Sequence, residues 1–506
     1  MLLGVALHAS LSFIAFPWPV HDTRRSDLLP LLLAAVHGFR MPLFFLLSGY
    51  FTMLVYSRRG LASLLEHRFR RIFLPLVIAT AIIVPLDKAI ERFARRTIRP
   101  EPSVAEILAG DEAAVRRRLA EPGAVDRADA FWRQKPIAWA TMQGDPAILR
   151  AVLDAGADAR ETGGNGTTPL HVAVYFGRDA AGRLLINRGA DPRAANVVGR
   201  LPAAIMAIPA DLTSEFAPLM GLNPISVDEV LDGRRKLRDA FPTGPNPEGT
   251  LGGPLDRATL AWSAALSSEW LRLRFGSWSL HLVQTNVFHH LWFLWSLCWL
   301  VAAFAILAMV GLLPTGRSRW WLVAASCLPQ AVMGVSISLG YGPDTSFGIL
   351  PRPHVLAFYG CFYFFGVATF AAEGLDTRLG HHWKLLVPVA LTLLAVSVAT
   401  MNDRAASAVL QPAYAWTMSA GLIGLFCRFF SRPSATVAWL ADASYWMYIV
   451  HVPLVMLAQL LVRPWPLPAE VKFVIVLAIV TPLLLVSYRW CVRHTPIGSL
   501  LNGPRP

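Results

Sequence analysis

Histidine and arginine side chains recur inside long apolar stretches of this sequence. A polar group at that depth must find a partner or water, so such residues usually serve a function. Ser48 lies in one of these stretches but has no G-x-S-x-G context, so we propose no serine nucleophile. We therefore expect the chemistry to lie among eight candidates, which are His8, His37, Arg40, Arg68, Arg71, His290, His354 and His451.

The types and spacing of these residues suggest what they could do. Histidine suits proton transfer because its unperturbed pKa lies nearest neutrality. His37 with Arg40, and Arg68 with Arg71, are each three residues apart, which predicts a shared helical face. A pair of arginines can bind phosphate groups. Each residue also has a structural alternative: helix packing for the histidines, and anchoring at the cytoplasmic surface for the two clustered arginines.

The elements that must position these residues are apolar helices. The chain has 506 residues, of which 55% are hydrophobic and only 16% charged, more apolar surface than soluble domains usually carry. A helix that crosses the hydrocarbon core needs about 20 residues. Ten stretches qualify or nearly do, at roughly 1–16, 28–54, 70–90, 288–312, 319–340, 354–372, 384–401, 411–430, 437–461 and 471–491. The sequence thus predicts an all-α, polytopic transmembrane bundle of about ten spans.

The first of these stretches starts in mid-pattern at Met1. It lacks the basic leader and small-residue cleavage site of a signal peptide, which leaves open whether Met1 is the true start.

Charge predicts how the bundle is oriented. The formal net charge is +13, and basic residues of membrane proteins collect in cytoplasmic loops. No basic stripe is interleaved with exposed aromatic residues, so we expect no nucleic-acid partner. Arginines cluster between the second and third stretches, which predicts a cytoplasmic N-terminus in the inner (plasma) membrane and places residues 91–287 outside the cytoplasm. The five cysteines show no metal-ligand spacing, so we expect no metal and no disulfide framework.

The long polar segment contains an internal repeat. Pro136, Pro169 and Pro202 recur every 33 residues, and one unit reads GNGTTPLHVAVYFGRDAAGRLLINRGADPRAAN. Its period and its T-P-L-H signature resemble the ankyrin repeat. We therefore predict an α-helical ankyrin solenoid over 103–210, followed by a linker over 211–287. His171 of the signature is expected to hydrogen-bond its turn, and the solenoid is expected to hold a protein partner or to shape access to the acceptor.

The membrane segments resemble a known family. A histidine in the first span, FRMPLFFLLSGYF, RFRR before the third span, HLWFLW and SYWMYIVHVPL occur in the order seen in the acyltransferase-3 superfamily, most closely its glucan-succinylating branch. The resemblance covers two parts of a membrane domain, 1–90 and 288–495. The ankyrin insertion departs from the ordinary family plan.

The resemblance implies transfer of an acyl group, of succinyl or acetyl type, from a cytoplasmic acyl-CoA to a hydroxyl of an extracytoplasmic glycan. Acyl-CoA would be a co-substrate, and no bound cofactor is expected. His8 would be the general base, and Arg68 and Arg71 would bind the donor phosphates. The acceptor side would hold the remaining candidates, which are His37, Arg40, His290, His354 and His451.

Other interpretations stay open at this point. The same machinery could acylate a different glycan or a lipid headgroup. A transporter or receptor-like membrane scaffold that displays ankyrin repeats is the alternative from another class, although no convincing inverted pairing of halves is visible. A scaffold with an inactive acyltransferase body is a third. Membrane lipid surrounds the protein in all of these.

Overall fold

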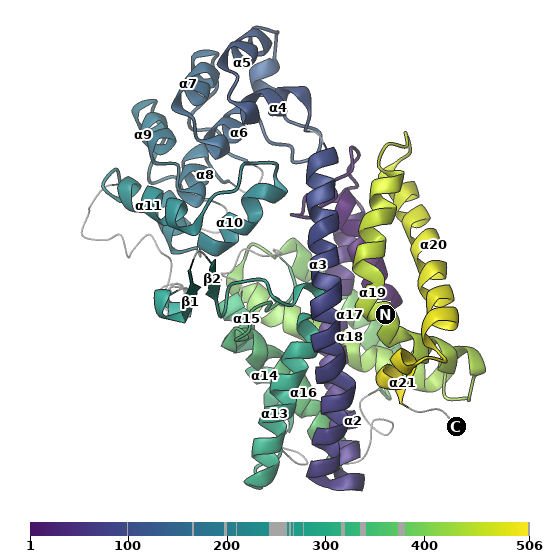
Figure 1. The fold of residues 1–506 in the computed structure, drawn as a ribbon. Helices are drawn as coiled ribbons and strands as arrows, with labels where there is room; N and C mark the ends of the chain where they lie inside the picture. The colour runs from purple at the N-terminus through teal and green to yellow at the C-terminus, as the bar shows by residue number, and fades with distance from the viewer. Residues whose placement is uncertain are drawn as a thin grey trace. The chain divides into compact units, whose positions relative to one another are not determined.

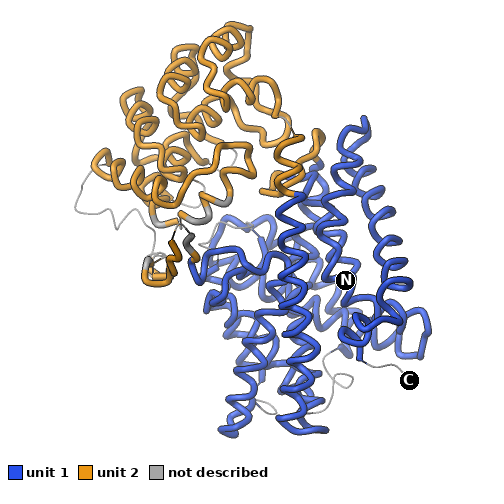
Figure 2. Tube along the Cα trace, viewed as in Figure 1, with its two compact units in different colours: residues 1–14, 26–90, 281–506 blue, residues 15–25, 91–280 orange. Residues whose placement is uncertain are grey.

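The computed structural model divides into two compact units (Figure 2). Unit 1 comprises residues 1–14, 26–90 and 281–506, and unit 2 comprises residues 15–25 and 91–280. The residues that the structure describes are 1–98, 100–163, 166–196, 200–208, 210–241, 261–262, 265–266, 268–276, 278–314, 319–333, 341–372 and 380–503.

Unit 1 is a bundle of apolar helices (Figure 1). Its elements are α1 (Leu2–Ser10), η1 (Leu11–Phe13), α2 (Leu29–Arg68), η2 (Phe69–Phe73), α3 (Leu74–Thr97), η6 (His289–Leu291), α13 (Trp292–Met309), α14 (Trp321–Ala325), α15 (Cys327–Met333), α16 (Pro353–Ala372), α17 (Trp383–Ala399), α18 (Arg404–Phe429), α19 (Ala435–Val462), α20 (Ala469–Ser487), η8 (Tyr488–Val492) and α21 (Pro496–Asn502). The end of α3, from residue 91, is counted with unit 2. The all-α class is confirmed, and each of the ten predicted stretches contains helix within the described residues.

Five helical stretches of the described residues are long and apolar enough to cross a membrane. They are Leu29–Thr97, His289–Met309, Pro353–Phe370, Ala435–Val462 and Ala469–Val492. Leu2–Phe13, Trp321–Met333 and Trp383–Ala399 are apolar but shorter. The count of ten spans therefore stays a prediction.

The long stretch Leu29–Thr97 holds two predicted spans and a reversal between them. Helical geometry breaks at Gly60, whose φ of 75° and ψ of 177° suit glycine because it has no Cβ. Arg68 Nη2 donates to Thr52 Oγ1 at 3.0 Å, and these two residues are equally far in sequence from Gly60. The two arms therefore run side by side in opposite directions, as spans joined by a short loop must.

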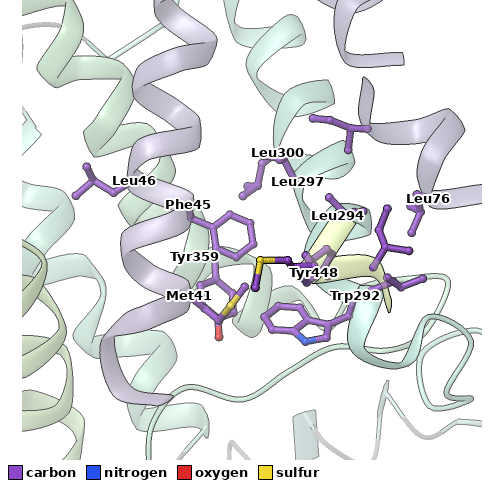
Figure 3. Packing of buried hydrophobic residues seen from close by; sticks show 14 of the residues in the cluster. Met41, Phe45, Leu46, Leu76, Trp292, Leu294, Leu297, Leu300, Tyr359 and Tyr448 are labelled. Carbon is purple, nitrogen blue, oxygen red and sulfur yellow. The ribbon is translucent and has the colours of Figure 1, made fainter. Parts of the chain in front are cut away.

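Aromatic side chains fill the core of unit 1 where α2, α13 and α16 meet (Figure 3). The Phe45 and Tyr359 rings stack with centroids 4.6 Å apart, and Trp292 lies 5.5 Å from Tyr359. Glycines let the backbones of α2 and α16 approach: a Cβ on Gly49 would collide with the carbonyl of Tyr363. This packing fixes the rotation of α2 and so decides which way its polar residues point.

Unit 2 contains the helix pairs that the 33-residue period predicts. They are α4 (Pro102–Ala109) with α5 (Glu112–Leu119), α6 (Pro136–Gln143) with α7 (Pro146–Asp154), and α8 (Pro169–Phe176) with α9 (Asp179–Asn187). The role predicted for His171 is confirmed, because its Nδ1 lies 2.8 Å from Thr168 Oγ1 and its Nε2 donates to the Arg200 carbonyl at 2.9 Å. Burial lowers the pKa of His171.

The start of the predicted linker, by contrast, is folded. After η4 (Pro202–Ala207) the chain forms α10 (Ala210–Leu219) and α11 (Val227–Arg238), which pack on α8. Arg234 of α11 is 4% exposed and donates to the carbonyls of Val174, Tyr175 and Ile208. One buried guanidinium thus binds two carbonyls in the last turn of α8, an arrangement that no 33-residue period reveals. Burial lowers the pKa of Arg234 to about 10.

Two strands, β1 (Arg272–Phe275) and β2 (Trp278–His281), pair later in the linker, and GPNPEGTLGGP of that linker lies outside the described residues.

The segment between α1 and α2 also belongs to unit 2. The His21 ring lies 4.8 Å from that of Phe131 and 5.0 Å from that of Trp132. Arg25 Nη1 donates to the Phe131 carbonyl at 3.4 Å. Residues 15–25 are therefore packed against the loop that precedes α6.

Candidate active site

Two histidines from opposite ends of the sequence meet in unit 1. His8 of α1 and His451 of α19 are 443 residues apart, and His451 Nε2 lies 2.9 Å from His8 Nδ1. Gln459, two turns further along α19, donates from Nε2 to the backbone carbonyls of His8 and Ala9, both at 3.1 Å. These bonds hold the short helix α1 against α19 at His8.

The hydrogen bonds of this pair fix where its protons lie. A carbonyl oxygen can only accept, so His451 Nδ1, 2.8 Å from the Tyr448 carbonyl, carries a hydrogen and its Nε2 is an acceptor. His8 Nδ1, 3.1 Å from the Gly4 carbonyl, likewise carries a hydrogen. It can donate to His451 Nε2 as well. Neutral His8 therefore has its lone pair on Nε2, the arrangement that a general base requires.

Exposure distinguishes the two histidines. His451 is 3% exposed, whereas His8 is half-buried. His8 is therefore the more accessible residue of the pair, and His451 is placed to orient it.

His290 of η6 stands against this pair. Its ring centroid lies 5.3 Å from that of His451, nearly perpendicular to it. His290 Nε2 donates to the Ile449 carbonyl at 3.0 Å, and Tyr448 Oη donates to the His290 carbonyl at 2.7 Å. The two bonds tie η6 to α19 within one turn of His451.

Arg40 of α2 brings a cation to the same place. A Cβ on Gly4 would lie 3.1 Å from Arg40 Nη1, so the guanidinium closely approaches α1 at this glycine. Arg40 interacts electrostatically with both His8 and His451. The structure therefore gathers His8, His451, His290 and Arg40 into one cluster, which we call the histidine cluster.

His37 and His354 lie by the loop 341–352. His37 Nε2 donates to the Pro343 carbonyl at 2.9 Å, and a Cβ on Gly342 would collide with the His37 ring. His354 lies in the first turn of α16, near the charge of Arg352. His37 thus binds the backbone of this loop. Arg40, three residues further along α2, is instead the residue that contributes to the histidine cluster.

Arg68 and Arg71 have different neighbours. Arg68 is turned toward Thr52 of α2, whereas the Arg71 guanidinium lies against Gly503 after α21. The wide π-helical turn η2 begins directly after Arg68 and includes Arg71. The three-residue spacing that predicts a shared face in an α-helix does not apply across such a turn.

Asp87 of α3 is the residue that the sequence reasoning missed. Its side chain is 2% exposed, and its Oδ2 lies 3.4 Å from His290 Nδ1. The signal was available, since Asp87 falls inside the apolar stretch 70–90 and an ionisable residue at that depth is a candidate by the rule applied to the histidines. It sits in PLDKAIERF, where the charges that follow resemble an ordinary span end.

Two family models match the chain. A family model described as an acyltransferase domain matches residues 1–97 and 258–489, together more than half of the chain. A model for three ankyrin repeats matches residues 104–196.

Curated relatives match over a short segment. Glucans biosynthesis protein C of Shigella dysenteriae serotype 1 is 35% identical over 83 residues, and that of Escherichia coli K12 is 34% identical over 83 residues. The segment covers 16% of this chain and 22% of each relative.

Proposed function

We propose that this chain, which belongs to the acyltransferase-3 family, transfers an acyl group of succinyl or acetyl type from a cytoplasmic acyl-CoA to a hydroxyl of an extracytoplasmic glycan. The observation that carries the proposal is the hydrogen bond between His8 Nδ1 and His451 Nε2, which leaves the lone pair of a half-buried histidine on Nε2. An oriented imidazole of this kind is what acyl transfer to an alcohol needs, because an alcohol is a weak nucleophile until a base takes its proton.

One base is sufficient for the proton transfers of this reaction. The acceptor hydroxyl oxygen attacks the thioester carbonyl carbon while His8 Nε2 takes the hydroxyl proton. His8 is then an imidazolium, whose Nδ1–H bond to His451 becomes charge-assisted and stronger. When the carbon–sulfur bond breaks, His8 returns the proton to the departing thiolate. An ester and a free thiol result, and His8 is neutral again.

The positive charges of the site suit the two anionic partners of this reaction. Arg40, beside His8, is placed to stabilise the negative charge that develops on the carbonyl oxygen during attack. Arg68 lies directly before η2 and Arg71 lies within it, and we assign both to the phosphates of acyl-CoA. These assignments follow from the charge and position of the arginines, and substitution of each arginine tests its role.

The glycan acceptor rests on the relatives. The proteins that match over 83 residues are named for the biosynthesis of glucans, which are glucose polymers rich in hydroxyl groups. The same chemistry would serve another glycan or a lipid headgroup, because the base needs only a hydroxyl.

Contacts within unit 2 indicate which loop shares the side of the ankyrin repeats, and the arginine cluster between the second and third stretches predicts that this side is extracytoplasmic. Residues 15–25 pack on Phe131 and Trp132, so the loop after α1 and the repeats share one side of the membrane. The two predicted spans on either side of the reversal at Gly60 would provide the two crossings that this requires.

A single cysteine at Ala180, which is exposed on α9, tests this side in a background without the five native cysteines. Labelling of intact spheroplasts by a membrane-impermeant thiol reagent is expected. Labelling only after lysis would place the repeats in the cytoplasm.

The activity is tested with the full chain in lipid nanodiscs, radiolabelled succinyl-CoA or acetyl-CoA, and glucose oligosaccharides as acceptors. We expect labelled ester from the wild type and a loss of about 10²- to 10⁴-fold in His8→Ala, which removes the base. His381→Ala, at an exposed histidine, is the matched control and should keep full activity. Equal rates in wild type and His8→Ala would refute the role of His8, and a wild type that neither transfers nor hydrolyses either donor would refute the proposed function.

A further inference from the structure

Asp87 is a buried carboxylate that the mechanism above does not use. It lies on α3 with its side chain 2% exposed, and its ion-pair partner is His290 Nδ1 at 3.4 Å. Among the described residues, neither Asp87 oxygen meets a donor in hydrogen-bond geometry. Burying a carboxylate costs several kcal/mol, and replacing a whole buried ion pair with apolar side chains of similar volume is often neutral or stabilising. Stability alone therefore gives no reason for an acid at this position.

The hydrogen bonds of His290 show what the acid does. His290 Nε2 must carry a hydrogen, because it faces the Ile449 carbonyl at 3.0 Å. Neutral His290 would then turn the lone pair of Nδ1 toward an oxygen of Asp87, an unfavourable contact. The contact becomes favourable when one proton lies between Nδ1 and Oδ2. Asp87 thus favours the orientation of the His290 ring in which Nδ1 faces α3 and Nε2 faces α19.

From Asp87 a continuous series of contacts leads to the base. His290 donates to Ile449 and accepts from Tyr448 Oη through its own carbonyl. The Tyr448 carbonyl accepts from His451 Nδ1, and this bond makes His451 Nε2 the acceptor for His8. A change at Asp87 therefore reaches His8 through the placement of one turn of α19.

We propose that Asp87 is a positioning residue for acyl transfer, which acts through His290 to hold the turn Tyr448–His451 in the place that orients His8. The inference rests on the proposed function and adds to it a carboxylate that touches no reacting atom. It explains why α3 carries an acid at the depth of the histidine cluster.

The test is a double-mutant cycle with the full chain in nanodiscs, measured as kcat and KM for radiolabelled succinyl-CoA with glucose oligosaccharides. Asp87→Asn should lower kcat by about 10- to 100-fold, as for groups that orient a catalytic residue, with KM for the donor unchanged. In a His290→Gln background the same change should cost less than about 2-fold, because the contact through which it acts is already lost. Asp87→Glu should recover part of kcat. Glu66→Gln, at an exposed carboxylate, is the matched control.

The outcomes separate this inference from the proposed function. A wild type without transfer would refute the function before Asp87 is examined. With an active wild type, four results would overturn the role of Asp87: Asp87→Asn within 2-fold of wild type, full additivity with His290→Gln, a rise in donor KM at constant kcat, or a fall in thermal stability that accounts for the lost activity. Unchanged thermal stability with reduced kcat would support it.

Discussion

Replacing His451 with phenylalanine separates orientation of the base from the base itself. The ring volume is kept, but the acceptor for His8 Nδ1–H at 2.9 Å is lost. The Gly4 carbonyl, 3.1 Å from the same nitrogen, still holds that hydrogen, so His8 keeps its lone pair on Nε2. We therefore expect a smaller loss than in His8→Ala.

The magnitude follows from the bond that strengthens during reaction. A hydrogen bond to a charged group contributes about 1.5–3 kcal/mol, and each 1.36 kcal/mol is tenfold in rate. Loss of the His451 acceptor should thus lower kcat by about 10- to 150-fold, whereas loss of the base at His8 should cost about 10²- to 10⁴-fold. His451→Gln, whose amide oxygen can accept from His8, should lie between wild type and His451→Phe.

The assay is transfer of radiolabelled succinyl from succinyl-CoA at saturating donor, with the thermal stability of each purified variant as control. His451→Phe as inactive as His8→Ala would contradict the reasoning, because it would make His451 itself the base. Equal rates for the Gln and Phe variants would show that the acceptor is irrelevant. A His451→Phe rate within 2-fold of wild type would remove His451 from the mechanism.

Three further predictions concern other parts of the chain. Arg68→Ala combined with Arg71→Ala should raise the KM for acyl-CoA by about tenfold or more with kcat within a few-fold, from loss of phosphate contacts; an unchanged KM would leave both as topological anchors. Burial keeps the pKa of His171 below its usual 6.5, so only the unfolded chain takes up this proton readily, and the stability of unit 2 should be full above about pH 6.5 and fall below it. Hydrogen exchange of α8 at about pH 5.5 and 7, corrected for intrinsic rates, should show this loss in wild type and not in His171→Gln; equal loss in both would assign it to other groups. Arg234→Met should destabilise unit 2 by about 2–4 kcal/mol, because buried carbonyls lose a charged donor. Hydrogen exchange of α8 and α11 measures this loss, with Arg238→Met as the control. Equal protection in the two variants would contradict the role given to Arg234.

Local patterns were sufficient to predict the class of the protein. Hydropathy is a property of each stretch, so the apolar helices, the all-α class and the inserted repeat could be predicted without knowing which helices touch. The same holds for His171, whose partners Thr168 and Arg200 belong to its own repeat and the start of the next. The linker was predicted too early because α11 joins the repeats through one buried arginine and not through the period.

The site residues were chosen from the sequence by one physical rule, that ionisable groups are costly within apolar spans. The rule selected His8, His290, His451 and Arg40, and applied fully it would have selected Asp87.

Only the tertiary structure decided which of these residues meet. Whether His451 faces His8 depends on the rotation of α19 against α1, which close packing across the whole bundle determines. For the same reason His37 and Arg40 contact different partners, and Arg71 is turned away from Arg68, although both pairs are three residues apart. A sequence specifies which groups are available for chemistry, but the hydrogen bonds that set their protons join helices hundreds of residues apart, and those contacts exist only once the helices have packed.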